Sequence, residues 1–192
     1  VLSNLLVQVE NGQLSLKGTD LEVELTARAG VDDSQDGDVT IPARKLFDIV
    51  RALPDGSRIT LPHAGDKATI QAGKSRYTLA TLPARDFPEN DQLAIIERIR
   101  VPEAALKELI ERTAFAMAQQ DVRYYLNGLL FDLKGKVLRC VSTDGHRLAL
   151  CETELSESIE NRKQIIMPRK GVLELQRLLE DSDGDIELEV GN

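Results

Sequence analysis

The amino-acid sequence predicts an α+β protein built from two similar units, each with helices packed on antiparallel sheets. Short runs of alternating apolar and polar residues predict half-buried strands, and three apolar stripes with helical spacing predict helices. In addition, strands followed by a helix occur in the same order in both halves of the chain. Helices that rest on antiparallel sheets define the α+β class.

The first half opens with a predicted hairpin. Strands at 5–9 and 13–17 flank the dipeptide Asn11-Gly12, which favours a two-residue turn. Apolar residues at every second position predict a further half-buried strand at 21–27, whose other face carries acidic residues. The same signals predict strands around 68–71, 75–82, 129–133, 137–141 and 186–190, and turns at Gly65-Asp66, Lys134-Gly135 and Asp144-Gly145.

A proline opens each predicted helix. Pro42, Pro102 and Pro168 suit the first turn of a helix, where a missing N–H costs nothing. The second helix is expected to extend to about Met117. The apolar faces consist of Leu46, Phe47, Val50 and Leu53, of Leu106, Leu109, Ile110, Ala114 and Met117, and of Val172, Leu173, Leu175 and Leu179.

The repeat divides the chain into residues 1–97 and 98–192, joined by a linker that begins near Pro83 and Pro88 and ends near Arg98. Compared with its counterpart, the first unit lacks a leading helix and the second lacks a closing hairpin, so we expect further segments to complete both. The corresponding residues are Leu5 and Leu129, Thr19 and Thr143, each 124 positions apart, and Pro42 and Pro168, 126 apart.

Composition excludes several classes of protein. The formal net charge is −8, which excludes a uniformly basic DNA-binding protein, so any contact with nucleic acid must use a local basic patch. No apolar run approaches the roughly 20 residues that a membrane-spanning helix needs. Because Cys140 and Cys151 lack metal-ligand spacing, we expect a buried pair of free thiols and no metal site. We also expect no cofactor.

Basic residues gather on two of the predicted helices, whereas residues 10–38 hold eight acidic residues and two basic ones. A basic helical face could bind phosphates without reading sequence. The simpler alternative is that these side chains only make an exposed face soluble. The basic residues are Arg44, Lys45 and Arg51 against Asp48, and Arg169, Lys170 and Arg177 against Glu174.

Two segments carry unusual side chains. In Gln120–Gly128, two tyrosines follow Arg123, which suits phosphate contact or base stacking, or else an ordinary strand with one ring buried. In Thr143–Leu148, Asp144 and His146 could act together in an enzyme such as a hydrolase. No nucleophile elbow or metal-ligand cluster accompanies them, so a tight turn with an exposed histidine is the simpler interpretation.

Over essentially its whole length, the chain resembles the beta subunit of bacterial DNA polymerase III, the sliding-clamp family. The resemblance implies a DNA-clamp fold with three similar domains per subunit, of which this chain covers most of the first and second. It also implies a head-to-tail dimer that forms a six-domain ring lined by helices. The similar runs are Gln120–Gly128, Thr143–Leu148, Met167–Gly171, Gly18–Glu22, Pro42–Lys45 and Gly73–Pro83.

The resemblance also implies three sets of functional residues. The second-domain wall of a peptide-binding pocket would consist of Leu126, Thr143, Gly145, His146, Arg147 and Leu148. Contacts with DNA would come from Gln120, Arg123, Tyr124, Tyr125, Arg44, Lys45, Arg51, Arg169, Lys170 and Arg177. The subunit interface would use Lys74, Arg76, Tyr77 and Leu79.

The function that the resemblance implies is that of a processivity factor, not of an enzyme. The implied partners are duplex DNA of any sequence, the catalytic subunit of DNA polymerase III, a clamp loader, and other polymerases and repair proteins with clamp-binding motifs. The complete protein would be a homodimer at the nucleoid in the bacterial cytoplasm, without contact with a membrane. A peptide-binding adaptor with no DNA role is the alternative that the residues leave open.

Overall fold

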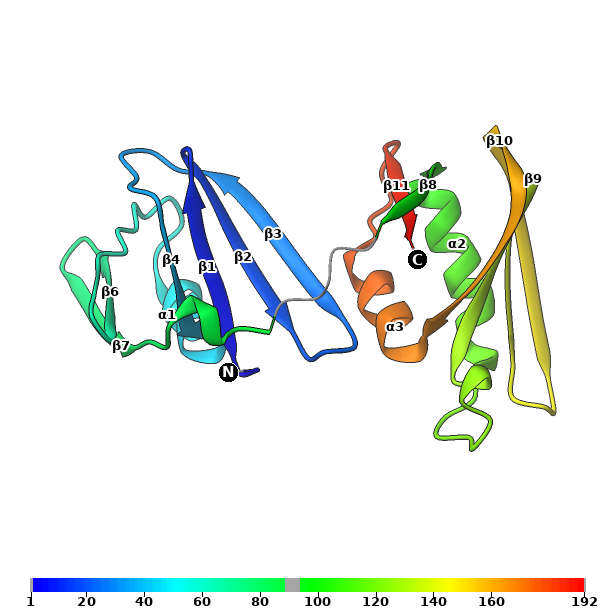
Figure 1. Ribbon diagram of the computed structural model, residues 1–192, viewed down its shortest axis with the longest axis horizontal. Coiled ribbons are helices and arrows are strands. Elements are labelled where there is room, and N and C mark those ends of the chain that lie inside the picture. The colour runs from blue at the N-terminus through cyan, green and yellow to red at the C-terminus, as the bar shows by residue number, and fades with distance from the viewer. Residues whose placement is uncertain (1, 89–93, 192) are drawn as a thin grey trace. The chain divides into compact units, whose positions relative to one another are not determined.

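The computed structural model describes residues 2–88 and 94–191, and the chain divides into two compact units, Val1–Asp91 and Gln92–Asn192 (Figure 1). Both contain helices beside antiparallel strands, so the predicted α+β class is confirmed. The helices are α1 (Ala43–Ala52), α2 (Glu103–Thr113) and α3 (Arg169–Leu178), with short 3₁₀ helices η1 (Ala84–Asp86), η2 (Ala114–Ala116) and η3 (Tyr124–Leu126).

Unit 1 contains a four-stranded antiparallel sheet in the order β3-β2-β1-β4 and a three-stranded sheet in the order β5-β6-β7. The predicted turn at Asn11-Gly12 is confirmed, and both residues have positive φ angles of 50° and 76°. Its strands are β1 (Asn4–Glu10), β2 (Gln13–Thr19), β3 (Glu24–Gly30), β4 (Gly37–Pro42), β5 (His63–Ala64), β6 (Lys67–Ala72) and β7 (Ser75–Ala80).

Unit 2 contains two antiparallel pairs, β9 with β10 and β8 with β11. The first part of β9 pairs with the end of β10, and its last part pairs with the start of β10, with register shifts between. Helices α2 and α3 both contact this long pair (Figure 1). The strands are β8 (Ile95–Pro102), β9 (Gly128–Thr143), β10 (Leu148–Pro168) and β11 (Asp185–Gly191).

Strand registers and helix starts confirm the repeat that the sequence predicts. A strand pair and a hydrogen bond at the start of a helix occur in both units at the predicted offsets. The matching contacts are the strand pairs Leu5–Ile41 and Leu129–Met167, and the hydrogen bonds that Ala43 N donates to Ser3 O (3.0 Å) and Arg169 N donates to Asn127 O (2.8 Å).

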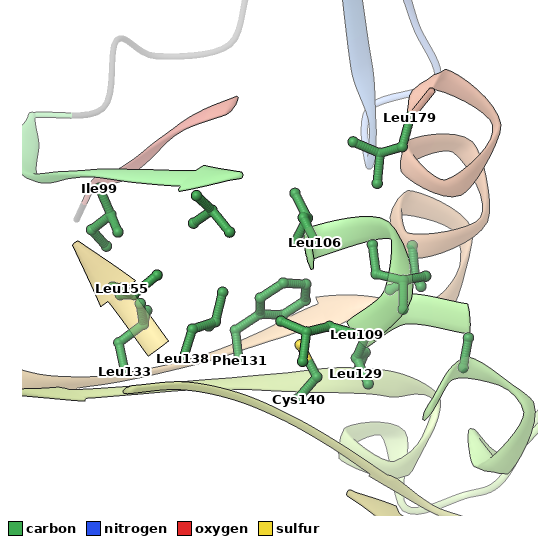
Figure 2. Packing of buried hydrophobic residues seen from close by; sticks show 14 of the residues in the cluster. Ile99, Leu106, Leu109, Leu129, Phe131, Leu133, Leu138, Cys140, Leu155 and Leu179 are labelled. Carbon is green, nitrogen blue, oxygen red and sulfur yellow. The ribbon is translucent and has the colours of Figure 1, made fainter. Parts of the chain in front are cut away.

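The core of unit 2 lies between α2 and the strands (Figure 2). Leu106, Leu109 and Ile110 of α2 are buried, as the predicted apolar stripe requires. They pack with Leu129 of β9 and with other buried side chains that include Phe131, Leu133, Leu138, Cys140, Leu155 and Val172. Unit 1 has a smaller core of Val7, Val39, Ile41, Ala68, Ile70 and Leu79.

Only part of the apolar face predicted for helix α1 packs against the sheet. Leu46 and Ile49 pack against the core, whereas Phe47 and Val50 are 55% and 42% exposed. The two pairs form adjacent stripes about one third of a turn apart, and the sheet covers only one of them. The apolar spacing alone does not distinguish the two stripes.

Two predicted strand limits also differ. The strand predicted at 21–27 begins only at Glu24, because Leu21 takes a left-handed conformation (φ 78°) in the preceding turn. The turn predicted at Lys134-Gly135 does not form, because β9 continues through both residues. Gly135 nevertheless has a positive φ of 56°, at the point where β9 changes from pairing with the end of β10 to pairing with its start. Helix α2 ends at Thr113, earlier than predicted, and η2 follows it.

The units divide at 91–92, six residues before the predicted boundary. Strand β8 begins at Ile95 and pairs with β11, so a division at 97–98 would cut a strand of unit 2. Part of the predicted linker, residues 89–93, lies outside the described residues. None of the helices in the described part of the chain has the length and apolarity to span a bilayer.

Candidate peptide-binding turn and nucleic-acid interface

The turn between β9 and β10 carries most of the predicted pocket residues, and two of its own side chains fix its backbone. Thr143 Oγ1 accepts a hydrogen bond from Gly145 N (3.1 Å) and donates one to Arg147 O (2.7 Å). Asp144 Oδ1 accepts from His146 N (2.9 Å) and from Arg147 N (3.0 Å). Such bonds hold a tight turn without help from neighbouring strands. The His146 and Arg147 side chains are consequently displayed at the surface.

Unit 1 contains the same turn between β2 and β3. Its third residue is a leucine that nevertheless takes a left-handed φ of 78°. The backbone of this turn is therefore a property of the repeat, and its side chains are what distinguish the second copy. The matching bonds are Leu21 N to Thr19 Oγ1 (3.0 Å), Thr19 Oγ1 to Val23 O (3.1 Å), Glu22 N to Asp20 Oδ1 (3.1 Å) and Val23 N to Asp20 Oδ1 (2.9 Å).

Arg147 is fixed on three sides. Its Nε donates to Asp144 Oδ2 (3.0 Å), its Nη2 donates to Phe115 O (2.8 Å), and its guanidinium lies 5.6 Å from the centre of the Phe115 ring. Phe115 and Leu148 are 59% and 64% exposed. Leu148 follows Arg147 in the chain, and Phe115 contacts it in space. A fixed cation beside two exposed apolar side chains suits a peptide that carries both an apolar and a polar group.

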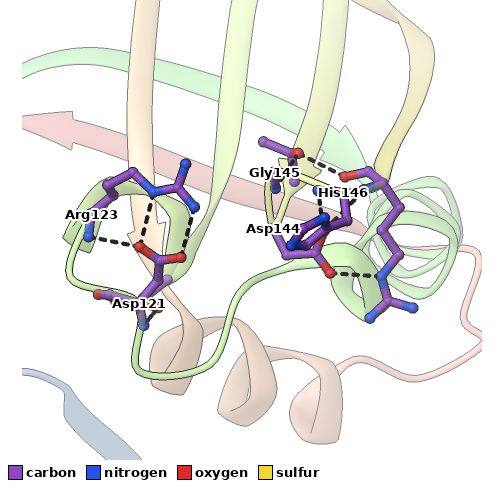
Figure 3. A network of polar contacts seen from close by, with 8 residues as sticks. Asp121, Arg123, Asp144, Gly145 and His146 are labelled. Atoms are coloured by element: carbon purple, nitrogen blue, oxygen red, sulfur yellow. Dashed lines mark hydrogen bonds and ion pairs between the residues drawn. The ribbon is translucent and has the colours of Figure 1, made fainter.

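The Asp144 carboxylate is committed to this turn. Hydrogen bonds from the main-chain N–H groups of His146 and Arg147, with a further bond from the Arg147 side chain, lower the pKa of Asp144 to about 2. The bond from His146 comes from its main-chain N–H and not from its ring (Figure 3). This geometry favours a structural role for Asp144 over the catalytic pairing with His146 that the sequence left open.

Leu126, the remaining predicted pocket residue, lies in η3 and is half-buried. The segment before η3 touches the turn, because the position of a Cβ on Gly145 would be only 3.2 Å from Arg123 Nη2. Two cavities in the described chain lie elsewhere, one of about 210 Å³ beside Asp132 and Arg162, the other of about 450 Å³ in unit 1. Of the six pocket residues, Gly145, His146, Arg147 and Leu148 are exposed, and Leu126 and Thr143 are half-buried.

The segment that leads to η3 displays its side chains outward. Tyr124 and Tyr125 are 83% and 50% exposed, with their rings edge to face at 5.9 Å, so neither ring occupies the core. Val122 is almost fully exposed, and Gln120 takes a left-handed φ of 56°. An ordinary strand with one buried tyrosine is therefore not what the sequence forms here.

Arg123 is held by Asp121. Oδ1 of Asp121 accepts from Arg123 N (2.8 Å) and Nε (3.0 Å), and Oδ2 accepts from Nη2 (2.9 Å) (Figure 3). These bonds from Arg123 lower the pKa of Asp121 to about 2. Reasoning from the sequence missed Asp121, Phe115 and the structural role of Asp144. The Asp-x-Arg and Asp-x-x-Arg spacings were a signal for the two carboxylates, whereas nothing local pointed to Phe115.

The six basic helix residues lie on α1 and α3 as predicted. Several of them make surface ion pairs or other contacts within the chain, which are weak enough for a phosphate to compete with. Lys45 and Lys170 are exposed. The contacts are Arg44 Nε to Asp48 Oδ2 (3.2 Å), Arg177 Nη1 to Glu174 Oε1 (2.7 Å), Arg51 over the Phe47 ring (6.0 Å) and Arg169 Nη1 to Met117 O (3.5 Å).

The predicted interface residues lie on or beside β7, which is an edge strand of its sheet. Lys74, Arg76 and Tyr77 are exposed, whereas the Leu79 side chain is buried in the unit 1 core. An edge strand offers unpaired main-chain groups to a strand of another molecule.

Among the described residues, no group of three or more histidine, cysteine or carboxylate side chains is placed to hold a metal ion. Cys140 and Cys151 lie opposite each other on β9 and β10 as free thiols.

Two domain families divide the sequence between them. The N-terminal domain of the DNA polymerase III beta subunit matches residues 1–91, and the central domain of the same subunit matches residues 100–192. The chain belongs to the DNA polymerase III beta subunit family. Its two units therefore correspond to two successive domains of that subunit.

Individual beta subunits agree with this assignment. The beta sliding clamp of Pseudomonas aeruginosa is 50% identical over 192 residues, and that of Escherichia coli K12 is 48% identical over 193 residues. The chain spans about half the length of these relatives, since it covers 52% of each. The crystal structure of the Pseudomonas aeruginosa DNA polymerase III beta subunit superimposes with a TM-score of 0.96 at 49% identity, over all of this chain and 53% of that one.

A second structure in the beta subunit family is the Pseudomonas aeruginosa sliding clamp bound to griselimycin. It superimposes with a TM-score of 0.94 at 49% identity and covers 99% of this chain and 52% of the other. These similarities establish the DNA-clamp fold in both units.

Proposed function

We propose that this chain forms two domains of a sliding clamp, a processivity factor whose ring encircles duplex DNA and tethers the replicative polymerase. One observation carries the proposal: the same basic face recurs on α1 and α3, at corresponding places in the repeat, in a chain whose net charge is −8. Solubility does not explain why basic residues occur at corresponding places on both helices of an acidic chain. Binding to phosphates gives the placement a purpose.

The mechanism is topological. A closed ring stays on DNA without a tight grip, and contacts with phosphates carry no sequence register, so the protein can slide. The acidic segment 10–38 repels DNA from the rest of the surface. Tethering raises the effective concentration of a bound polymerase at the primer end, which is what processivity requires. The clamp itself makes and breaks no bond.

The peptide-binding surface recruits the partners. Leu148 and Leu126 receive the apolar anchor of a clamp-binding motif, and Arg147 and His146 supply the polar edge. Thr143 and Gly145 shape the turn that presents them. The Pseudomonas aeruginosa clamp was solved with griselimycin bound, which supports a ligand-binding surface in this family. The partners are the polymerase III catalytic subunit, the clamp loader, and other polymerases and repair proteins with such motifs.

A homodimer completes the ring, with the β7 edge and the side chains of Lys74, Arg76 and Tyr77 at the subunit interface. DNA contacts come from the six basic residues of α1 and α3, and from Gln120, Arg123, Tyr124 and Tyr125. As a replication factor, the protein acts in the bacterial cytoplasm, where the nucleoid lies.

Salt-dependent binding to duplex DNA tests the proposal. Replacement of the four basic residues Arg44, Lys45, Arg169 and Lys170 by alanine should weaken binding of a fluorescein-labelled duplex and lower the dependence of log K on log salt. The slope should fall by about 0.9 for each phosphate contact that is lost.

A matched control removes the same charge from other exposed residues. The control variant replaces Arg58, Lys67, Lys134 and Lys136, which lie outside the helices. This control variant should keep most of the dependence of log K on log salt. Equal losses in the two variants would mean that only net charge matters, and the clamp proposal would then lose the observation that carries it.

A further inference from the structure

Gly145 lies against one edge of the Arg123 guanidinium. A Cβ added to Gly145 would meet Arg123 Nη2 at 3.2 Å, Nη1 at 3.4 Å and Cζ at 3.7 Å. Because both terminal nitrogens are nearer than Cζ, the Nη1–Nη2 edge of the planar group, and not its face, points at the glycine. The residues are far apart in sequence, so this contact joins the segment before η3 to the turn between β9 and β10.

The repeat supplies an internal control for the role of this glycine. The corresponding residue in unit 1 is Leu21, which has nearly the same left-handed φ, 78° against 89° for Gly145. The turn therefore forms with a side chain at this position. What distinguishes Gly145 is that the Arg123 guanidinium occupies the space which a side chain would fill.

Two other residues hold Arg123 in this position. The Asp121 carboxylate binds it through both side-chain oxygens, as described above. Asn127 in turn fixes Asp121, because Asn127 Oδ1 accepts from Asp121 N (2.9 Å) and Asn127 Nδ2 donates to Asp121 O (2.8 Å). A chain of contacts thus leads from Asn127 through Asp121 and Arg123 to Gly145. Figure 3 shows its last three members.

We propose that Asp121 is a positioning residue for the peptide-binding turn, which acts by holding the Nη1–Nη2 edge of the Arg123 guanidinium against Gly145. This inference rests on the proposed function and deepens it. Arg123 is 49% exposed at its side chain and a phosphate can reach it. A phosphate that draws Arg123 from Asp121 also removes the group that covers Gly145, beside His146. Binding of DNA and binding of peptide therefore oppose each other through Arg123.

A double-mutant cycle on peptide binding tests this inference. The probe is a fluorescein-labelled peptide with a polymerase clamp-binding motif, and the proteins are wild type, Asp121→Asn, Arg123→Ala and the double variant. Each single substitution should weaken binding about three- to tenfold, and the double variant should bind no more weakly than Arg123→Ala. Asp33→Asn, which removes another carboxylate with an exposed arginine partner, should leave peptide binding unchanged.

Two further measurements separate positioning from simple loss of charge. Arg123→Lys keeps the positive charge but lacks both the two-nitrogen edge and the paired bonds to Asp121, so it should bind peptide as weakly as Arg123→Ala. A saturating short duplex should weaken peptide binding by wild type and should not weaken it in Arg123→Ala. Independent, multiplicative effects of Asp121→Asn and Arg123→Ala, or wild-type affinity in Asp121→Asn, would overturn the inference.

The amide resonances of Gly145 and His146 provide a readout that needs no peptide. In ¹H–¹⁵N spectra, Asp121→Asn should shift both resonances and leave those of the matching unit 1 residues, Leu21 and Glu22, in place. Unchanged Gly145 and His146 resonances would overturn the inference. If the wild-type protein bound neither duplex nor peptide, the proposed function would fail, and these resonances would still decide whether Asp121 positions the turn.

Discussion

At Gly128, the addition of a single methyl group should destabilise the fold. A Cβ there would lie 2.6 Å from Met167 O and 2.8 Å from Ile166 Cγ2, against an ordinary contact of 3.4–4 Å. The backbone angle is not the cause, since Gly128 is not among the residues with positive φ. The obstacle is the neighbouring strand, and the backbone oxygen of Met167 cannot turn away as a flexible side chain could.

The cost of Gly128→Ala follows from this geometry. Overpacking of a closed site typically costs about 1–3 kcal/mol. A smaller gain opposes it, because alanine restricts the unfolded chain and contributes about 0.4–1 kcal/mol. The net expectation is a loss of about 0.5–2 kcal/mol in the free energy of unfolding of unit 2. Because Asn127 O accepts the first N–H of α3, a displaced β9 also moves the start of that helix.

Urea unfolding followed by far-UV circular dichroism measures this loss, and hydrogen exchange of β9 and β10 amides assigns it to unit 2. Gly37→Ala in β4 is the matched control, since a Cβ at Gly37 meets nothing within 4 Å. That variant should be unchanged or more stable by about 0.4–1 kcal/mol. Wild-type stability in Gly128→Ala, or an equal loss in Gly37→Ala, would show that the strand contact does not constrain residue 128.

Three other predictions concern the site and the titrating groups. Arg147→Ala and Leu148→Ala should each weaken peptide binding by about 1–3 kcal/mol, measured by fluorescence anisotropy. The Arg162 guanidinium holds the pKa of Asp132 below its usual 3.8. The pair therefore stabilises the fold above that usual value, and this stability is lost as the pH falls through the lowered pKa. Arg162→Ala should raise the Asp132 pKa in a carboxyl NMR titration. Burial raises the pKa of the Cys140 thiol to about 12, so at about pH 8 iodoacetamide should modify it only in unfolded protein, as mass spectrometry would show.

Local chemistry accounts for the parts of the fold that the sequence predicted. Proline before each helix and Asn-Gly at the first hairpin act over a few residues, and the repeat fixed the correspondence between the halves. The face of α1 could not be predicted, because Leu46 with Ile49 and Phe47 with Val50 satisfy the same spacing and only the sheet selects between them. For the same reason, the contact between Arg123 and Gly145 depends on tertiary structure.

The duplication separates residues that build the turn from residues that act through it. Threonine and aspartate occur in both copies and make the same four hydrogen bonds, so Thr143 belongs to the scaffold as much as to the pocket. Where unit 1 has Leu21 and Glu22, unit 2 has a glycine covered by an arginine and an exposed histidine. A fold that repeats its backbone can change one copy at little structural cost. Function is therefore best sought where the two copies share a conformation and differ in side chains.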